Sequence, residues 1–557
     1  MNTTDPWHSL YVFLHAGTED TDAFLLHEAA PLLDGLVAAG EAERWFFIRY
    51  AEDGPQVRVR VRGLAPAAAA RLPDELARAA GKVTPVPGPW SSRHGEVRAV
   101  PYVPETERYG GPRALPLAEE VFVESSQVVL GVLRDLSAGG GASARLAHAS
   151  DLVHATVHAL GLDRLTAARW LRRHAAGWRW VREVPLLPGA SVHTRVNSVY
   201  AAQRSGLERR ARGLRERLAD GTAAPWLLRW ERRVRATDGL LRAGEGADAA
   251  PDATAWIWGS QLHMLLNRLG VTPDEERAVC RLVARTLMET GEPAGYFPDG
   301  HTAPDFQYLE RSKFQIGRNQ DTALRAVPPG PARSAPSAPE LPLPAGPLPE
   351  VSLGAALAGR ASVRGALGGP LDAAGLGALL WHSLADGERG GRPLPEDAPV
   401  HRAHPSAGGL YTARVRLLVL DVEGVPAGTY DCVPERRTLR PVGPAPATAE
   451  IASLSTYLSR PATDPHWIGI DGAPVVLALY AELGLLRRRY GLRALRLALL
   501  ETGHLAQNLL LTGTALGLAG TPLGGFHDDL AHELLGLDDL EQPLQYLLPL
   551  GRRPAAG

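Results

Sequence analysis

A proline-rich segment divides this chain of 557 residues. Residues 327–350, VPPGPARSAPSAPELPLPAGPLPE, contain nine prolines. Proline lacks a backbone N–H and clashes with the preceding helical turn, so the segment cannot hold a helix or a central strand. We expect a semi-stiff linker over 327–350 between two domains, 1–326 and 351–557, each long enough to bury a core.

Composition excludes several classes of protein. The formal net charge is −2, which gives no reason to expect direct nucleic-acid binding. The two cysteines, Cys280 and Cys432, lie far apart and outside any CxxC or Cys/His cluster, so we expect neither a disulfide framework nor a metal site. The N-terminus shows no signal-peptide pattern and no apolar stretch is long enough to span a membrane. We therefore expect a cytoplasmic protein without membrane segments.

Hydrophobic periodicity predicts an α+β fold in both halves. In the N-terminal half, strands are expected over 10–14, 44–50 and 56–63, with an Asp-Gly turn between the last two. Helices are expected over 23–40 and through most of 117–290, and Thr272-Pro-Asp-Glu275 is typical of a helix start. The C-terminal half predicts helices over 371–385 and 493–517, and strands over 413–423, 428–433, 474–481 and 543–550.

Arginine and valine alternate along residues 56–62, QVRVRVR. The period of two places Val57, Val59 and Val61 on one face of a strand and Arg58, Arg60 and Arg62 on the other. By itself this pattern is typical of a half-buried sheet with one solvated face. The alternative is a row of cations that binds carboxylates.

Three further segments occur with this row: WFFIRY at 45–50, ETERYGG at 105–111, and SQLHMLLNR at 260–268, which places His263 and Asn267 on one helical face. A lone histidine there would more often be structural. In this order, however, the segments resemble the C-terminal domain of lantibiotic dehydratases, which also occurs as a separate protein in thiopeptide pathways. The resemblance covers about residues 5–320.

This resemblance implies removal of glutamate from glutamylated Ser or Thr, which leaves a dehydroamino acid. His263 would be the acid/base, and Arg58, Arg60 and Arg108 would bind the glutamate. Gln56 stands where the family usually has His, so the role of position 56 is open. The chain lacks the large region that transfers glutamate in full-length dehydratases, so we expect a separate partner that uses glutamyl-tRNA. Two alternatives are a domain that forms pyridines by cycloaddition and a non-catalytic peptide-binding domain.

The C-terminal half carries a second ordered set of motifs: RASVR at 360–364, HPSAGGLY at 404–411, ETGHLAQN at 501–508, LGGF at 523–526 and LPLGR at 548–552. Two guanidinium groups and a hydroxyl can clamp a phosphate, and glycines allow close approach to a flat ligand. Taken singly, these motifs also fit a solvated helix end, an ordinary turn, and a helix-packing or dimer contact.

Together the motifs resemble the nitroreductase superfamily, and within it the peptide-azoline dehydrogenases. The resemblance implies an α+β homodimer, joined through this domain, with FMN at the protomer interface. Its implied FMN-binding residues are Arg360, Ser362, Arg364 and Arg552 at the phosphate, Ser406 and Gly408 from the partner protomer, and Gly524 and Gly525 beside the isoalloxazine.

Arg489-Tyr490 stands where this family often shows Lys-Tyr as its catalytic pair. Oxidation of an azoline removes a proton and a hydride. A phenol is a weak base at neutral pH unless a cation stabilises its phenolate, and a guanidinium cannot itself be the base. We therefore expect Tyr490 to be the general base and Arg489 to act electrostatically. The alternative is that Tyr490 only packs beneath the flavin.

The fusion of these two halves resembles the bifunctional eliminase–dehydrogenases of lactazole-type thiopeptide pathways. Both halves would act on one precursor peptide, and tethering would raise the local concentration of the second active site. A separate cyclodehydratase would supply the azolines. The competing interpretation of the C-terminal half is a general quinone- or nitro-reducing flavoprotein.

Overall fold

The computed structural model describes residues 7–139, 142–181, 184–245, 253–288, 303–314, 339–344, 346–384 and 402–552. The chain folds into two units. The first comprises Met1–Leu187 and Thr194–Glu289, and the second comprises Pro188–His193 and Thr290–Gly557. Each unit combines helices with an antiparallel sheet and has its own core, which confirms the predicted α+β class.

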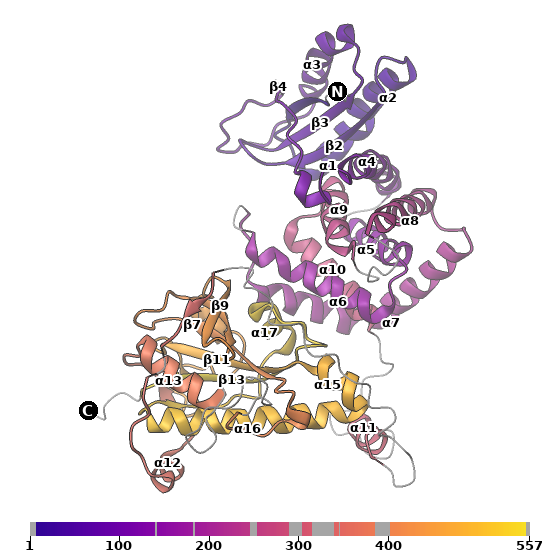
Figure 1. Cartoon of the computed structure of the whole chain (residues 1–557). Coiled ribbons are helices and arrows are strands. Elements are labelled where there is room, and N and C mark those ends of the chain that lie inside the picture. Colours follow the sequence, from indigo (N-terminus) through magenta and orange to yellow (C-terminus); the bar gives the residue numbers. More distant parts are fainter. Residues whose placement is uncertain are drawn as a thin grey trace. The chain divides into compact units, whose positions relative to one another are not determined.

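The first unit, indigo to magenta in Figure 1, contains a four-stranded sheet in the order β2-β3-β1-β4. Its strands are β1 (His8–Phe13), β2 (Arg44–Tyr50), β3 (Gln56–Arg62) and β4 (Val97–Ala99). Its helices are α1 (Thr18–Phe24), α2 (Ala30–Ala38), α3 (Pro66–Ala80), α4 (Leu115–Ser137), α5 (Ala142–Ala159), α6 (Arg164–Gly177), α7 (Gly189–Ala219), α8 (Pro225–Glu245), α9 (Ala255–Arg268) and α10 (Pro273–Leu287). The first residues of α7, up to His193, belong to the second unit.

Two local signals position the elements of this unit as predicted. The β2–β3 turn contains Asp53 (φ 62°) and Gly54 (φ 130°), a conformation that Asp tolerates and Gly adopts freely. At the start of α10, the Thr272 hydroxyl accepts the Glu275 N–H and the Glu275 carboxylate accepts the Thr272 N–H. This reciprocal cap sets the direction in which α10 enters the core.

The second unit contains a seven-stranded antiparallel sheet in the order β12-β13-β11-β7-β8-β9-β5. Its strands are β5 (Leu341–Pro342), β7 (Ala413–Val419), β8 (Gly428–Val433), β9 (Thr438–Gly443), β11 (Val475–Ala481), β12 (Ala519–Gly520) and β13 (Leu544–Gly551), with a separate parallel pair β6 (Gly365–Ala366) and β10 (Ile468–Gly469). Its helices are α11 (Pro304–Arg311), α12 (Leu353–Gly359), α13 (Ala373–Leu384), α14 (Thr448–Ala452), α15 (Leu483–Tyr490), α16 (Ala494–Ala515) and α17 (Asp528–Leu535).

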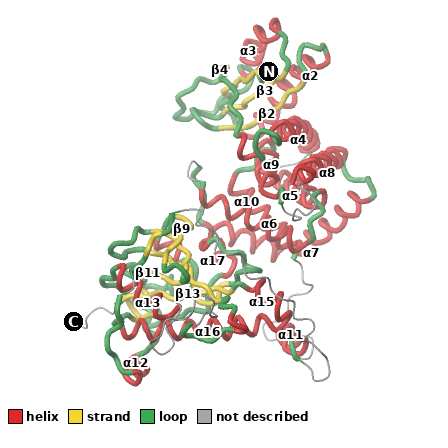
Figure 2. The backbone as a smooth tube through the Cα atoms, in the orientation of Figure 1, coloured by secondary structure: helices red, strands yellow, loops and turns green. Residues whose placement is uncertain are grey.

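Helices cover both faces of this sheet (Figure 2). Every residue of β11 is buried, and alternate residues enter different cores. Val475, Leu477 and Leu479 pack with α13 and α16, whereas Val476 and Ala478 pack with α14 and α17. A strand buried on both faces explains the continuous apolar run of the sequence.

The proline-rich segment is partly built into this sheet. Leu341–Pro342 forms β5 and pairs with β9 at the sheet edge, where a missing N–H is tolerated. Glu340 accepts hydrogen bonds from Arg436 and Thr438. Residues 327–338 of the predicted linker lie outside the described part of the chain. Within the described residues, no helix has the length and apolar character needed to cross a membrane.

Candidate functional site

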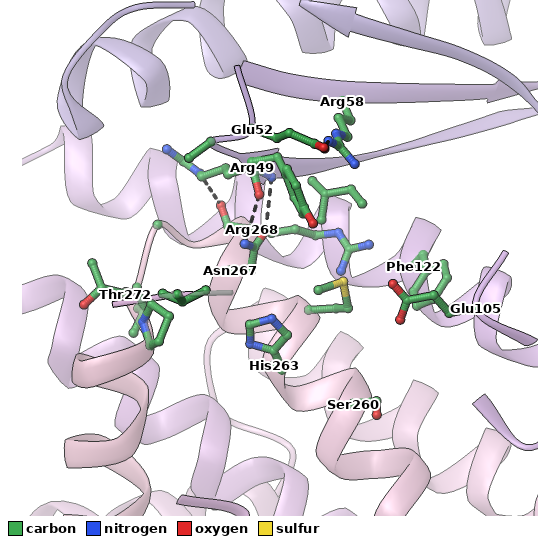
Figure 3. Close-up of a pocket in the computed structure, with 18 of the residues that line it drawn as sticks. Arg49, Glu52, Arg58, Glu105, Phe122, Ser260, His263, Asn267, Arg268 and Thr272 are labelled. Carbon is green, nitrogen blue, oxygen red and sulfur yellow. Dashed lines mark hydrogen bonds and ion pairs between the residues drawn. The ribbon is translucent and has the colours of Figure 1, made fainter. Parts of the chain in front are cut away.

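A cavity of about 1900 Å³ lies on the arginine face of the first unit's sheet. Its walls come from β2, β3, the segment 100–109, α6 and α9, and Figure 3 shows the side chains that extend into it. All four residues predicted to act in the first unit line this cavity: Arg58, Arg60, Arg108 and His263. Segments more than 200 residues apart in the sequence, such as those of Arg58 and His263, thus meet at one site.

Two arginines of the row are buried, which argues against a simple solvated face, the simpler of the two interpretations. Val57, Val59 and Val61 enter the core as the alternation predicts, but Arg58 and Arg60 are only 8% and 6% exposed. The Arg58 guanidinium lies 4.1 Å from the ring centroid of Tyr11 and 3.6 Å from that of Tyr50, and pairs with Glu52 at 2.8 Å.

The ETERYGG segment brings Arg108 to the cavity. A 3₁₀ turn, Thr106–Tyr109, carries the side chain, which pairs with Glu105 at 2.8 Å and donates to the Ser260 hydroxyl on α9 at 3.3 Å. Gln56 is buried and also lines the cavity. Its amide donates to the Glu52 carbonyl, and an amide cannot act as the acid or base that a histidine would supply there.

His263 extends from α9 into the cavity (Figure 3). Its Nδ1 lies 2.9 Å from Glu276 Oε2, and its ring meets Trp178 edge-on at 4.8 Å. A carboxylate only accepts hydrogen bonds, so we assign the imidazole proton to Nδ1. The Nε2 lone pair is then free to accept a proton from a ligand.

Glu276 on α10 holds two histidines, and sequence reasoning missed it. It is fully buried, and its Oε1 accepts from His174 Nε2 at 2.7 Å and from Trp178 Nε1 at 3.1 Å. Burial alone would raise the pKa of Glu276, but the neighbouring His263 and His174 outweigh this and hold it well below its ordinary value. A signal was available, because a glutamate precedes Val279 and Val283 on an otherwise apolar helix face.

Asn267 fastens α9 to the edge of the sheet. Its side-chain oxygen accepts the Arg49 N–H at 3.1 Å, and its side-chain amide donates to the Arg49 carbonyl at 3.0 Å (Figure 3). This pair of hydrogen bonds imitates a neighbouring strand and satisfies the exposed edge of β2. His263 precedes Asn267 by one helical turn, and Arg268 follows it directly. The two hydrogen bonds of Asn267 therefore also place these side chains beside the arginine row.

In the second unit, three of the predicted phosphate-binding residues lie beside β12, and the fourth, Arg360, ends α12. Ser362 forms a β-bridge with Gly520, and Arg364 donates to the Thr521 hydroxyl at 3.4 Å. Arg552 directly follows β13, which pairs with β12. Among the described residues, Arg360, Arg364 and Arg552 have no carboxylate partner. These three cations and one hydroxyl therefore fit a phosphate monoester.

The predicted catalytic pair, Arg489 and Tyr490, lies against the turn Ala407–Gly409, the glycine loop. Gly408 has φ 61°, and a β-carbon there would lie 2.5 Å from Tyr490 Oη and 3.0 Å from Arg489 Cζ. A side chain at position 408 would have to displace Tyr490 and Arg489, and the positive φ also favours glycine. The Arg489 guanidinium lies 5.6 Å from the Tyr490 ring centroid, near enough to stabilise a phenolate.

Ser406 and the two later glycines have different surroundings. The Ser406 hydroxyl donates to Glu501 at 2.7 Å and accepts the Tyr411 N–H at 2.7 Å, and Glu501 also accepts the Ala413 N–H. Buried Glu501 thus holds the glycine loop on α16. At Gly524 and Gly525, the nearest atoms to an added β-carbon lie at 4.0 and 3.8 Å, so both leave room for a flat ligand. No group of His, Cys, Asp and Glu in the described residues could hold a metal ion.

Comparison with known proteins identifies both units. Residues 7–287 match the family described as "Lantibiotic biosynthesis dehydratase C-term", and residues 357–552 match the "Nitroreductase family". The nitroreductase-family protein MJ1384 of Methanocaldococcus jannaschii is 33% identical over 206 residues, which cover 37% of this chain and 92% of that protein.

Two further proteins are similar to parts of this chain. The microcin B17-processing protein McbC of Escherichia coli is 33% identical over 148 residues, which cover 26% of this chain and 52% of that protein. The solved structure of the pyridine synthase TbtD from thiomuracin biosynthesis is 24% identical, covers 51% of this chain and 97% of its own, and has a TM-score of 0.38. The chain belongs to the lantibiotic dehydratase C-terminal family through its first unit and to the nitroreductase family through its second.

Proposed function

We propose that this chain is a bifunctional enzyme of thiopeptide biosynthesis. The first unit eliminates glutamate from glutamylated Ser or Thr in a precursor peptide, and the second oxidises azolines to azoles with FMN. The observation that carries the first activity is one cavity that combines buried arginines with a histidine whose Nδ1 is held by a buried carboxylate. The elimination needs both a base and cations for a leaving carboxylate.

In the elimination, Nε2 of His263 takes the proton from the α-carbon of the glutamylated residue. The electron pair of that C–H bond forms the Cα=Cβ double bond, and the Cβ–O bond breaks as the glutamyl carboxylate leaves with the bonding pair. Arg58, Arg60 and Arg108 bind the glutamyl group. Glu276 stabilises the imidazolium that forms, because its carboxylate accepts the Nδ1–H.

In the oxidation, Arg360, Ser362, Arg364 and Arg552 hold the FMN phosphate, and Gly524 and Gly525 leave space beside the ring system. When bound, FMN supplies a hydride acceptor. The phenolate of Tyr490, stabilised by the Arg489 guanidinium, takes the proton from the azoline ring carbon and becomes a neutral phenol. Glu501, through Ser406, keeps the glycine loop beside this pair.

The geometry of α16 supports a homodimer through the second unit. The phosphate-binding cluster lies near Thr514, which contacts Gly359, whereas the glycine loop and Tyr490 lie near Glu501 and beyond. These two points are roughly 20 Å apart at the usual rise of about 1.5 Å per residue, farther than a ribityl chain reaches. Figure 1 shows α12 beside one end of α16 and α15 beside the other.

A second, antiparallel copy would bring opposite ends of two α16 helices together and complete each flavin site. The surface available for it is apolar. Leu499 and Leu500 on α16 and Leu357 on α12 are 50%, 60% and 54% exposed, and a second copy would cover them. Ser406 and Gly408 would then reach the flavin of the partner protomer.

The substrate of both units would be a precursor peptide with a leader and a modified core. A separate glutamyl-tRNA-dependent partner would glutamylate it and a cyclodehydratase would form its azolines. The test is mass spectrometry of such a peptide after incubation with the protein and FMN. We expect the loss of one glutamic acid per glutamylated residue and of two hydrogens per azoline. Pyridine formation without glutamate loss, or no change at all, would contradict the elimination.

A further inference from the structure

The arginines of the cavity differ in whether the protein already neutralises them. Six arginines line it. Four of these have interaction partners: Arg49 with Asp22, Arg58 with Glu52, Arg108 with Glu105, and Arg173. The other two, Arg60 and Arg268, have no hydrogen-bonded or carboxylate partner among the described residues. The cavity therefore contains two cations whose charge is not compensated.

Arg268 is the more unusual of the two. It is fully buried, and its Nε, Nη1 and Nη2 all lack hydrogen-bond partners within the described chain. Burial lowers the pKa of Arg268 to about 9, so the guanidinium remains charged at neutral pH. A buried cation without a partner is strongly unfavourable. Its side chain crosses the cavity above His263 in Figure 3.

Arg60 and Arg268 lie on the same aromatic cluster. Their guanidinium carbons are 5.6 and 5.8 Å from the ring centroid of Phe46, and Arg268 is also 5.3 Å from that of Phe122. The ring centroid of Tyr102 lies 4.8 Å from the guanidinium carbon of Arg60. Cation–π attraction to the aromatic rings reduces the free energy needed to bury the two cations. The rings accept no N–H hydrogen bonds in their plane, so the five N–H donors of Arg268 remain available to an anion.

We propose that Arg60 and Arg268 form the site for the carboxylate that is released during elimination. This inference rests on the proposed function of the first unit and assigns different carboxylates to different arginines. A glutamyl ester carries one free carboxylate before the reaction and two afterwards. Arg58 and Arg108, already paired with acids, bind the carboxylate that is present throughout. The two uncompensated cations meet the charge that develops as the Cβ–O bond breaks.

Burial makes these two cations suited to that role. A charge interaction in a site from which water is excluded is much stronger than one at the surface. Because the leaving carboxylate gains its charge only in the transition state, cations aimed at it raise kcat more than they lower KM. Removal of Arg268 should therefore affect kcat, whereas removal of Arg108 should affect KM.

The test compares Arg268→Met with Arg62→Met in the full chain. Methionine keeps much of the apolar length of arginine and removes the charge. Arg62 lies on the same face of β3, pairs with Glu43 and does not line the cavity, so it is the matched control. For Arg268→Met we expect a kcat for glutamate release lower by about 10- to 100-fold, with KM within about threefold. The inhibition constant of free L-glutamate should be at least about tenfold higher for Arg268→Met than for Arg62→Met.

Stability separates a ligand-binding role from a structural one. Replacing an uncompensated buried charge by a hydrophobic side chain is neutral or stabilising. We therefore expect the melting temperature of Arg268→Met without ligand to be no lower than that of Arg62→Met. A marked drop, a failure to fold, or an unchanged kcat would overturn the inference. A wild-type protein that releases no glutamate would instead refute the proposed function itself.

Discussion

Replacement of Glu276 by glutamine tests whether this carboxylate sets the protonation of His263. Glutamine has nearly the same shape but no charge, and it has one acceptor oxygen where glutamate has two. Two donors, His174 Nε2 and Trp178 Nε1, converge on Oε1, and only His263 Nδ1 faces Oε2. The amide oxygen should therefore remain with the two donors, and the amide NH₂ should turn toward His263.

This arrangement forces a change of tautomer. Facing an N–H donor, Nδ1 of His263 must offer its lone pair, so the proton moves to Nε2 and the base is lost. General-base catalysis contributes about 10²- to 10⁴-fold, and a hydrogen bond to a charged group contributes about 1.5–3 kcal/mol. We expect the rate of glutamate release to fall by at least about 10²-fold, with little change in KM.

The assay is release of glutamic acid from a glutamylated peptide by the full chain, followed over time. Glu275→Gln is the matched control, because it makes the same charge change one residue away and glutamine still completes the helix cap. Circular dichroism and thermal melting check that the first unit of each variant is folded. A Glu276→Gln enzyme that works within about threefold of the control would refute the tautomer argument.

Three further predictions concern stability, flavin binding and assembly. The folded chain lowers the pKa of Glu276 below its ordinary 4.5. The charged carboxylate therefore stabilises the fold above that pH, and this contribution disappears as the pH falls. Below about pH 4.5, the melting temperature of Glu276→Gln should fall less than that of wild type. Ala at both Arg360 and Arg364 should weaken FMN binding at least about tenfold, measured by flavin fluorescence, and unchanged retention would remove them from the phosphate site. Leu500→Asp should convert a dimer into a monomer with weaker FMN retention in light scattering, and a dimer that persists would place the interface elsewhere.

Local sequence patterns predicted much of the fold. The alternation at 56–62 and the Asp-Gly turn predicted β3 and its hairpin with β2, and the structure contains both. Thr272-Pro-Asp-Glu275 predicted the start of α10. These features depend on residues close in sequence, whose backbone preferences and side-chain faces can be read without knowledge of tertiary packing.

The features missed in the sequence depend on contacts between distant segments. Glu276 and His174 are 102 residues apart, and only the packing of α10 against α6 brings them together. The burial of Arg60 likewise depends on the segment that carries Tyr102 and on the aromatic cluster. Periodicity identifies the face on which a residue lies but not what covers that face, so an arginine row resembles a solvated surface.

The two activities were expected in separate units, and their predicted residues do lie in separate units of the chain. The most direct test uses one peptide that carries both a glutamylated serine and an azoline, treated with wild type, His263→Ala and Tyr490→Phe, and analysed by mass spectrometry. Wild type should remove glutamic acid and two hydrogens. His263→Ala should form the azole and keep the glutamyl group, and Tyr490→Phe should release glutamic acid, retain FMN and leave the azoline unoxidised. If either single substitution abolishes both reactions, or if His263→Ala releases glutamate at the wild-type rate, the account of two independent active sites is contradicted.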